Sequence, residues 1–228
     1  MAASTPFGRL EKFLGLPLSL KFGFASFLAG AATRGFLFRI HHLVTLLRFR
    51  ASGVRYGRGL ETWGGIILNL YPGSRVELGN GVSIISDSWR STASALAMKT
   101  RLRTFTPSSA ILIGDHAGLN GTSITSRSTE IRIGDHTMIA PNVIITDSDF
   151  HIPWPPEGRR RYPGTERDAP VTIGRNCWIG INAIILKGVT IGDNSVIAAG
   201  SVVVDDIPAD CLAGGVPARV IKTYRKEN

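Results

Sequence analysis

The chain lacks the cysteine content and the short motifs that mark several common classes of protein. Cys177 and Cys211 are its only cysteines in 228 residues, too few for a disulfide framework, and this favours a reducing compartment. It contains neither a Gly-x-Ser-x-Gly nucleophile elbow nor a Gly-x-Gly-x-x-Gly or phosphate-loop lysine motif. These absences disfavour a serine hydrolase and the common dinucleotide- and nucleotide-binding folds.

Long apolar runs are also absent. The longest uncharged run in the apolar stretch 13–33 is 22–33, which is shorter than the roughly 20 residues that span a bilayer. A signal peptide ending near 29–31 is an alternative, but Pro17 and Lys21 interrupt the apolar region that such a peptide needs. We therefore expect no membrane-spanning helix in this stretch and disfavour a cleaved signal.

Acidic residues are scarce near the N-terminus. Residues 1–60 carry nine Lys and Arg against the single acid Glu11, whereas the rest of the chain holds 17 bases and 16 acids. Of the formal net charge of +9, residues 1–60 therefore carry +8 and the rest of the chain +1, so the basic character belongs to the N-terminal arm. This arm has no interleaved aromatics on its polar face and matches no nucleic-acid reader motif, so we expect no nucleic acid as a partner.

What the chain does contain is a strict six-residue repeat of aliphatic residues. Such a period fits neither the helix nor the strand, and it is typical of short strands joined by corners and wound into a β-solenoid. The repeat also appears at 133–145, 113–119 and 78–84, which places the solenoid at 54–207; the spacing does not decide its handedness. The clearest run is Ile173, Ile179, Ile185, Ile191, Ile197 and Val203.

Two further patterns support a narrow interior with tight corners. Asn176, Asn182 and Asn194 fall at the corners, where a positive φ is often needed and asparagine tolerates it. His116 and His136 occupy equivalent positions and are predicted to be turn residues. Two positions before each repeat residue the side chain is small or β-branched and is predicted to point inward: Val171, Cys177, Ala183, Val189, Ser195 and Ser201.

Four segments depart from the repeat. Residues 86–109 and 147–170 interrupt its phase and are predicted to be loops, which is where a solenoid carries its binding residues. Residues 208–228 form a short C-terminal tail that begins with a Gly/Pro-rich stretch. Residues 1–53 show no repeat and form the basic arm.

Within the arm, residues 34–50 predict an amphipathic helix. Two roles remain open for it. A basic amphipathic helix can lie on an anionic membrane surface, and an apolar helix face can cover the open end of the first coil; one helix could do both. The apolar face would hold Phe36, Leu37, Ile40, Leu43, Val44 and Leu47.

His151 is the most informative polar residue. It lies in a proline-flanked loop six positions after Ile145, where the repeat would otherwise place an aliphatic residue. An imidazole titrates near neutral pH and can act as a general base, and the neighbouring Asp147 and Asp149 could orient it. The alternative is a loop histidine that binds nothing.

Other polar and aromatic residues admit two interpretations. The run 159–161 is either a solvated loop or a site for an anionic ligand, and Trp89, Trp154 and Tyr162 either stack on a sugar or cover the core. A catalytic zinc site would need three converging ligands, but His116 and His136 fall on corners of the repeat and His151 in a loop. We therefore expect no metal.

The segments 171–221 and 133–151 resemble the hexapeptide-repeat acetyltransferases. The resemblance is greatest to the galactoside, maltose and nodulation O-acetyltransferases, a branch that includes enzymes of surface-polysaccharide biosynthesis. It covers 110–225 strongly and 54–109 loosely, and it does not cover the arm. It implies a left-handed parallel β-helix, a homotrimer, and acetyl-coenzyme A in a groove between neighbouring subunits.

The resemblance also implies roles for individual residues. His151 is the expected general base, and Asn120 is expected to contact the acceptor. One departure is Val204-Asp205-Asp206, where many relatives carry Thr-Lys-Asp, so an acid replaces one basic contact to the coenzyme. The residues expected to bind the coenzyme are Trp178, Ile181 through an oxyanion-binding N–H, Ala199 through its backbone, and Arg219 and Lys222 through its phosphates.

These expectations define a cytoplasmic acetyl-CoA-dependent O-acetyltransferase that acts on a sugar hydroxyl of a surface glycan or its precursor, by direct transfer. Peripheral contact with the inner membrane face through the arm is a further expectation. The alternatives are an N-acetyl- or N-formyltransferase for a nucleotide-linked amino sugar, a zinc enzyme like the γ-carbonic anhydrases, and a non-catalytic scaffold.

Overall fold

A computed structural model of the chain describes residues 18–160 and 164–224. These residues fall into two compact units, Met1–Ile40 and His41–Asn228, and helix α2 (Leu18–Ala51) contributes to both. In the first unit, the described residues are the N-terminal part of this helix, with Phe36, Leu37 and Ile40 exposed. No described helix has the length and apolar character needed to cross a membrane.

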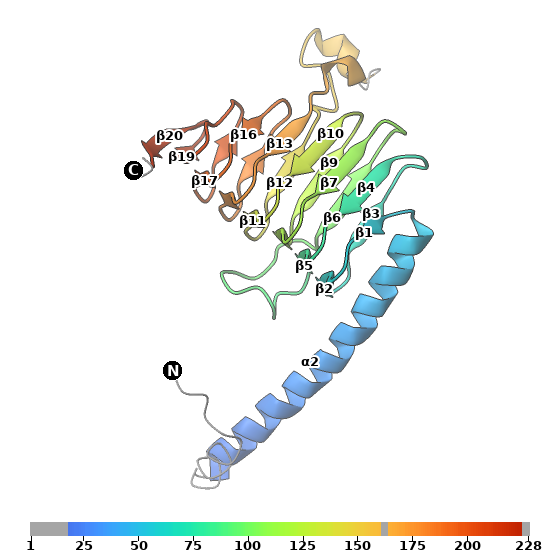
Figure 1. Ribbon diagram of the computed structural model, residues 1–228, viewed down its shortest axis with the longest axis vertical. Helices are drawn as coiled ribbons and strands as arrows, with labels where there is room; N and C mark the ends of the chain where they lie inside the picture. Colours follow the sequence, from blue (N-terminus) through green and yellow to red (C-terminus); the bar gives the residue numbers. More distant parts are fainter. Residues whose placement is uncertain (1–17, 161–163, 225–228) are drawn as a thin grey trace. The chain divides into compact units, whose positions relative to one another are not determined.

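The second unit is a β-solenoid of three parallel sheets, here called sheets A, B and C (Figure 1). Sheet A holds β1 (Arg55–Tyr56), β4 (Arg75–Leu78), β7 (Ala110–Ile113), β10 (Glu130–Ile133), β13 (Val171–Ile173) and β16 (Thr190–Ile191). Sheet B holds β2 (Glu61–Trp63), β5 (Ser83–Ile85), β8 (Gly118–Asn120), β11 (Met138–Ile139), β14 (Trp178–Ile179), β17 (Val196–Ile197), β19 (Cys211–Gly215) and β20 (Ala218–Thr223). Sheet C holds β3 (Ile67–Asn69), β6 (Arg101–Thr104), β9 (Ser123–Ser126), β12 (Ile144–Thr146), β15 (Ile184–Ile185) and β18 (Val202–Val203).

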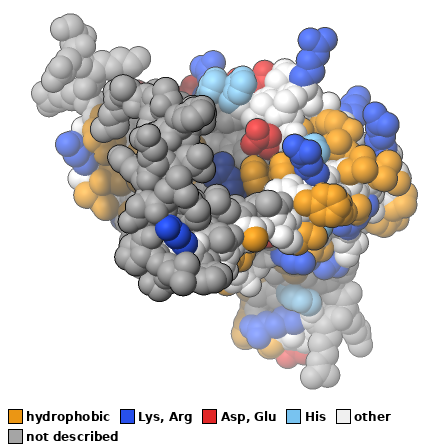
Figure 2. Space-filling view, turned by 90° about the horizontal axis from the view of Figure 1, so that it is seen from below, with side chains coloured by type: hydrophobic (Ala, Val, Ile, Leu, Met, Phe, Trp, Pro, Cys, Tyr) orange, Lys and Arg blue, Asp and Glu red, His pale blue; other side chains and the backbone are white. Residues whose placement is uncertain are grey.

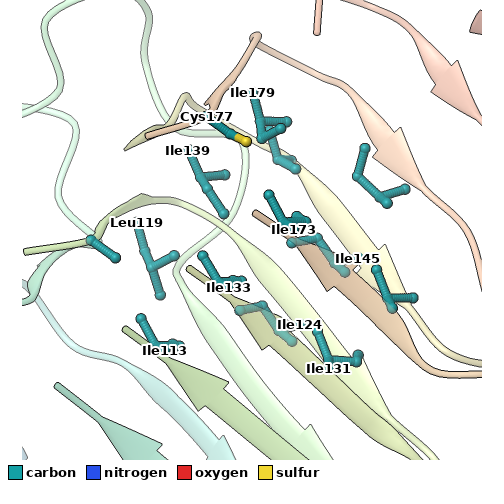
Figure 3. Packing of buried hydrophobic residues seen from close by; sticks show 14 of the residues in the cluster. Ile113, Leu119, Ile124, Ile131, Ile133, Ile139, Ile145, Ile173, Cys177 and Ile179 are labelled. Carbon is teal, nitrogen blue, oxygen red and sulfur yellow. The ribbon is translucent and has the colours of Figure 1, made fainter. Parts of the chain in front are cut away.

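The repeat residues form aliphatic columns inside the solenoid (Figure 3). Ile133 pairs with Ile173 on sheet A, and Ile139 pairs with Ile179 on sheet B. Burying one such side chain stabilises the fold by about 2 kcal/mol. The predicted inward positions are confirmed, because the six repeat residues from Ile173 to Val203 are at most 1% exposed.

The predicted corners are also confirmed. Asn176, Asn182 and Asn194 have φ values of 54°, 57° and 60°. His116 and His136 have φ values of 56° and 58°, and their rings stack 5.0 Å apart on successive coils. These two histidines are therefore turn residues, as the repeat predicts.

The segment predicted as the loop 86–109 contains strand β6. Leu102 of this strand is fully buried, and β6 pairs with β3 and with β9. The repeat misses β6 because its buried residues, Leu102 and Thr104, alternate with arginines. The excursion between β5 and β6 is therefore shorter than predicted and covers 86–100.

The C-terminal segment 208–228 also contains regular structure within its described part. Strand β19 continues sheet B in parallel with β17, and β20 returns antiparallel to it. Cys211 and Ala213 of β19 are fully buried. This hairpin covers the last coil, so the described part of the predicted tail belongs to the solenoid.

The first coil is covered by residues 41–51 of α2, which belong to the same unit as the solenoid. Phe49 is fully buried and lies 5.9 Å from the Tyr56 ring, while Arg48 Nη1 donates to the Ile66 carbonyl at 2.8 Å. The helix covers the coil with a face other than the predicted apolar one, however. Leu43 and Leu47 are 59% and 57% exposed, so the most apolar stripe of the helix is not the one that packs.

Candidate functional site

An apolar groove runs along the outer face of sheet B. Its volume is about 580 Å³, and it is lined by side chains that point away from the core at the ends of β5, β8, β11, β14 and β17. Met138 and Trp178 stand on this face, 60% and 53% exposed. The six-residue repeat leaves these outward positions free of core packing, so they can be apolar for a ligand.

Four of the predicted site residues meet in this groove. Asn120, Trp178, Ile181 and Ala199 all line it, although they come from different coils. The backbone N–H of Ile181 makes no hydrogen bond within the described part of the chain, so it can donate to a ligand. Among the residues that the structure describes, no arginine or lysine lines the groove.

Asn120 has an unsatisfied acceptor. Its Nδ2 donates to Ser91 Oγ at 3.4 Å, whereas its Oδ1 is buried and has no hydrogen-bond partner among the described residues. Leaving a buried acceptor unpaired costs about 1–3 kcal/mol. A hydroxyl or amine of a bound molecule would remove this cost.

The excursion 86–100 borders the same groove, as expected of a loop that interrupts the repeat, although the sequence did not single out the residues involved. Thr92 and Ala93 line the groove, and the Ala97 N–H donates to Asn142 Oδ1 at 2.9 Å. Neither Thr92 nor Ala93 belongs to the repeat or to a recognisable motif. The departure from the repeat was the only signal in the sequence that this segment contributes to binding.

His151 is exposed, and its tautomer follows from its hydrogen bond. Its Nδ1 lies 2.9 Å from the carbonyl oxygen of Arg159. A carbonyl oxygen only accepts, so Nδ1 must carry the proton. In the neutral ring Nε2 then has a free lone pair, which is the form of the ring that can take a proton from a substrate.

The two aspartates expected to orient His151 have other partners. Asp147 is fully buried, and its carboxylate accepts from the backbone N–H groups of residues 127–129. Asp149 forms an ion pair with Lys187 at 2.5 Å. The prediction that these carboxylates orient the imidazole is therefore wrong, and a backbone carbonyl does so instead.

Within a single chain, His151 does not reach the groove. The segment 147–170 leaves the solenoid between β12 of sheet C and β13 of sheet A, and the excursion 86–100 leaves it elsewhere, between β5 and β6 (Figure 1). In a three-sided prism the edge between sheets A and C lies opposite sheet B. His151 is not among the residues that line the groove.

The predicted phosphate-binding residues lie on β20, at the edge of sheet B. Arg219 Nη1 pairs with Asp205 Oδ2 at 2.7 Å, and both side chains are 63% exposed. Lys222 Nζ lies 5.2 Å from the Tyr224 ring. Asp205, the acid that departs from the family pattern, thus contacts one of the cations expected to bind the coenzyme.

Metal and thiol chemistry find little support in the described residues. No group of three or more His, Cys, Asp and Glu side chains within 18–160 and 164–224 is arranged to hold a metal ion. Burial raises the pKa of the Cys177 thiol, which keeps it protonated at neutral pH and unsuited to nucleophilic attack.

Known proteins share this repeat and this fold. Residues 170–205 match the family described as bacterial transferase hexapeptide (six repeats). The chain is 48% identical over 92 residues to the galactoside O-acetyltransferase of Escherichia coli (strain K12), covering 40% of this chain and 43% of that protein. It is 43% identical over 107 residues to the galactoside O-acetyltransferase of Lactococcus lactis, covering 47% of this chain and 49% of that protein. The chain thus spans about half the length of these relatives.

A solved structure extends the likeness to most of the chain. AntD, an N-acyltransferase from Bacillus cereus in complex with dTDP and 3-hydroxybutyryl-CoA, superimposes with a TM-score of 0.59 at 18% identity, covering 80% of this chain and 89% of AntD. At this identity the likeness concerns the fold. The predicted resemblance to the hexapeptide-repeat acetyltransferases is confirmed, as is the predicted left-handed parallel β-helix with an N-terminal helix.

Proposed function

We propose that this hexapeptide-repeat protein is an acetyl-CoA-dependent O-acetyltransferase that acts on a sugar hydroxyl of a surface glycan or its precursor. The observation that carries the proposal is the apolar groove on sheet B, where Asn120, Trp178, Ile181 and Ala199 come together. The relatives named galactoside O-acetyltransferase support the acetyl donor and the sugar acceptor.

In this proposal the acetyl group passes directly from the thioester to the acceptor. His151 Nε2 takes the proton of the acceptor hydroxyl as its oxygen attacks the thioester carbonyl. The Ile181 N–H donates to the oxygen on which negative charge develops. The tetrahedral adduct then collapses to the acetyl ester and the coenzyme thiolate, and the imidazolium returns its proton to that sulfur. Asn120 Oδ1 accepts a hydrogen bond from the acceptor.

The donor would lie along the groove. Trp178 and the apolar lining would pack against its pantetheine arm, and Arg219 and Lys222 would meet its phosphates. Because Asp205 already pairs with Arg219, this contact would have to open or be shared when the phosphates arrive.

A homotrimer would complete the site. Because His151 lies on the segment that leaves the prism opposite the groove, the imidazole of one subunit would meet the groove of its neighbour in this proposal. Cyclic symmetry then produces three equal sites. The outer face of sheet A suits solvent rather than a subunit contact, because its charges form ion pairs between Arg75 and Glu77 and between Arg132 and Glu130.

The test is acetyl transfer by the purified full-length protein to a panel of glycan acceptors, followed by product mass. Replacing His151 with alanine should lower kcat by about 100-fold or more while light scattering still reports a trimer. His41→Ala, at an exposed histidine on α2, is the matched control and should keep full turnover. Unchanged turnover in His151→Ala would remove this residue from the mechanism.

N-acylation of a nucleotide-linked amino sugar is the second candidate function. The N-acyltransferase AntD shares the fold, and a histidine base could serve an amine as well as a hydroxyl. Including amino-sugar acceptors in the same panel separates the two, because an amide product resists the mild base that cleaves an acetyl ester.

We further propose that the arm holds the enzyme at the inner face of the cytoplasmic membrane. Phe36, Leu37 and Ile40 are exposed on α2, and hydrophobic side chains are interspersed with Lys and Arg on one face of the molecule (Figure 2). The native protein should sediment with vesicles that contain phosphatidylglycerol, whereas a variant carrying serine at these three positions should stay in the supernatant. Equal sedimentation of the two proteins would contradict membrane contact through the arm.

A further inference from the structure

A buried polar cluster lies beneath the segment that carries His151. Arg127 and Ser148 are each only 4% exposed, and Asp147 is fully buried. Arg127 Nη1 lies 3.6 Å from Asp168 Oδ1, and the Asp168 side chain is also fully buried. Asp147 and Asp168 flank the excursion, so the cluster ties both ends of the segment to strand β9 and the turn after it.

Such a cluster is a poor way to gain stability alone. Desolvating buried charges often costs as much as their attraction returns, so an apolar core of similar volume would serve as well. Arg127 is also incompletely satisfied, because its Nη2 has no hydrogen-bond partner among the described residues. The geometry that the cluster imposes is therefore the better explanation for its presence.

The cluster is connected to His151 through Ser148 and Phe150. Arg127 Nη1 donates to Ser148 Oγ at 2.9 Å, and the Phe150 N–H donates to the same oxygen, also at 2.9 Å. Ser148 Oγ thus joins a buried guanidinium to the backbone of the residue that precedes the imidazole.

Phe150 has a backbone conformation that needs such support. Its φ is +61°, in the left-handed region that an aromatic residue rarely adopts and that costs about 1–3 kcal/mol. Its ring packs 5.6 Å from the Phe105 ring and 5.8 Å from the Arg127 guanidinium. Because φ of Phe150 sets the direction in which the chain leaves towards His151, these contacts fix where the imidazole stands.

We infer that Arg127, Ser148 and Phe150 are positioning residues that aim His151 at the acceptor hydroxyl. The inference rests on the proposed function, since it takes His151 as the base. None of the three needs to touch substrate. Their effect is on the geometry of proton transfer, where a misplacement of about 1 Å can cost about 100-fold in rate.

The first experiment compares two buried serines. Ser148→Ala should lower kcat by about 10-fold to 100-fold, with the KM for acetyl-CoA and the thermal midpoint close to those of the native enzyme. Ser195→Ala is the matched control, because Ser195 is fully buried and donates to the Pro208 carbonyl, far along the chain from His151. It should retain the native kcat.

A second pair separates the backbone conformation from the aromatic ring. Phe150→Asn and Phe150→Val both remove the ring, but asparagine tolerates a positive φ and valine opposes it. We expect Phe150→Asn to retain a kcat several-fold higher than that of Phe150→Val. Equal kcat values would overturn the role of the backbone conformation, and this pair decides the question if Ser148→Ala fails to fold.

A spectroscopic measurement tests the positioning without turnover. Nitrogen shifts of labelled histidine should report the Nδ1–H tautomer for His151 in the native trimer and a mixture of tautomers in Ser148→Ala. If His151→Ala keeps its turnover, the proposed function fails. If His151→Ala is inactive while Ser148→Ala keeps both the native kcat and the native tautomer, only the positioning is overturned.

Discussion

At the scale of single residues, the corners show how much the fold depends on side chains that tolerate a positive φ. Asn182 has φ 57° and an exposed side chain. Asn182→Ala should lower the free energy of unfolding by about 1 kcal/mol, because a left-handed conformation is unfavourable for alanine. Asn182→Gly should cost much less. Denaturant unfolding of the two variants checks this, and equal losses would mean that backbone conformation is not the cause.

Two corner carboxylates make stability depend on pH. The Arg175 backbone N–H and then its side chain lower the pKa of Asp193 from 3.8, and the Asn80 backbone N–H lowers the pKa of Asp115. Because the folded-state pKa lies below the unfolded one, this stabilisation is present above about pH 4 and is lost as pH falls through the folded value.

The double variant Asp115→Asn, Asp193→Asn should therefore lose less stability than the native protein between about pH 5 and pH 2.5. Urea midpoints measured across that range give the slope of stability against pH for each protein. The asparagines keep a carbonyl oxygen for the same backbone donors, so the comparison isolates titration. Identical slopes would show that other acids dominate acid unfolding.

The repeat predicted some residues well and others poorly, for a physical reason. Inward positions such as Ile179 and corners such as Asn182 depend on local spacing, which a sequence displays. The partners of His151 depend on how coils stack. Asp147 lies four positions from His151, yet its carboxylate accepts hydrogen bonds from residues 127–129 of the preceding coil. No local sequence pattern predicts these partners.

At the scale of elements, α2 illustrates the limits of an amphipathic pattern. The most apolar stripe, which includes Leu47, is exposed, and the packed face mixes Phe49 with Thr45 and His42. His42 Nδ1 lies 3.0 Å from Thr62 Oγ1. Because the polar partner Thr62 lies on the first coil, a hydrophobic pattern alone predicts the helix but does not identify the face that packs.

The two faces can be compared directly. Phe49→Ala should lower the free energy of unfolding by about 3–5 kcal/mol, since it removes a fully buried ring and leaves a cavity. Leu47→Ala, on the exposed stripe, should change it by less than about 0.5 kcal/mol. Thermal and chemical unfolding of the pair measure both. A large loss in Leu47→Ala would mean that the exposed stripe packs against another chain.

At the scale of the whole molecule, the separation of His151 from the sheet B groove has a consequence that mixing can test. The experiment combines two inactive variants by co-refolding. His151→Ala lacks the imidazole, and Ala140→Trp fills the groove with an indole. If each site takes its imidazole from one subunit and its groove from the next, about a quarter of the sites in randomly mixed trimers pair an intact histidine with an intact groove. About a quarter of the native kcat per site should return, although neither parent is active.

The same mixture distinguishes the opposite arrangement. If one chain supplied both the imidazole and the groove, every subunit in the mixture would carry one defect and no activity would return at any ratio. Titrating the ratio sharpens the test, because recovery between neighbours follows the product of the two fractions and peaks at equal amounts. Recovery that peaks elsewhere, or that is absent while light scattering shows mixed trimers, would exclude a shared site and return the search for the base to residues that line the groove.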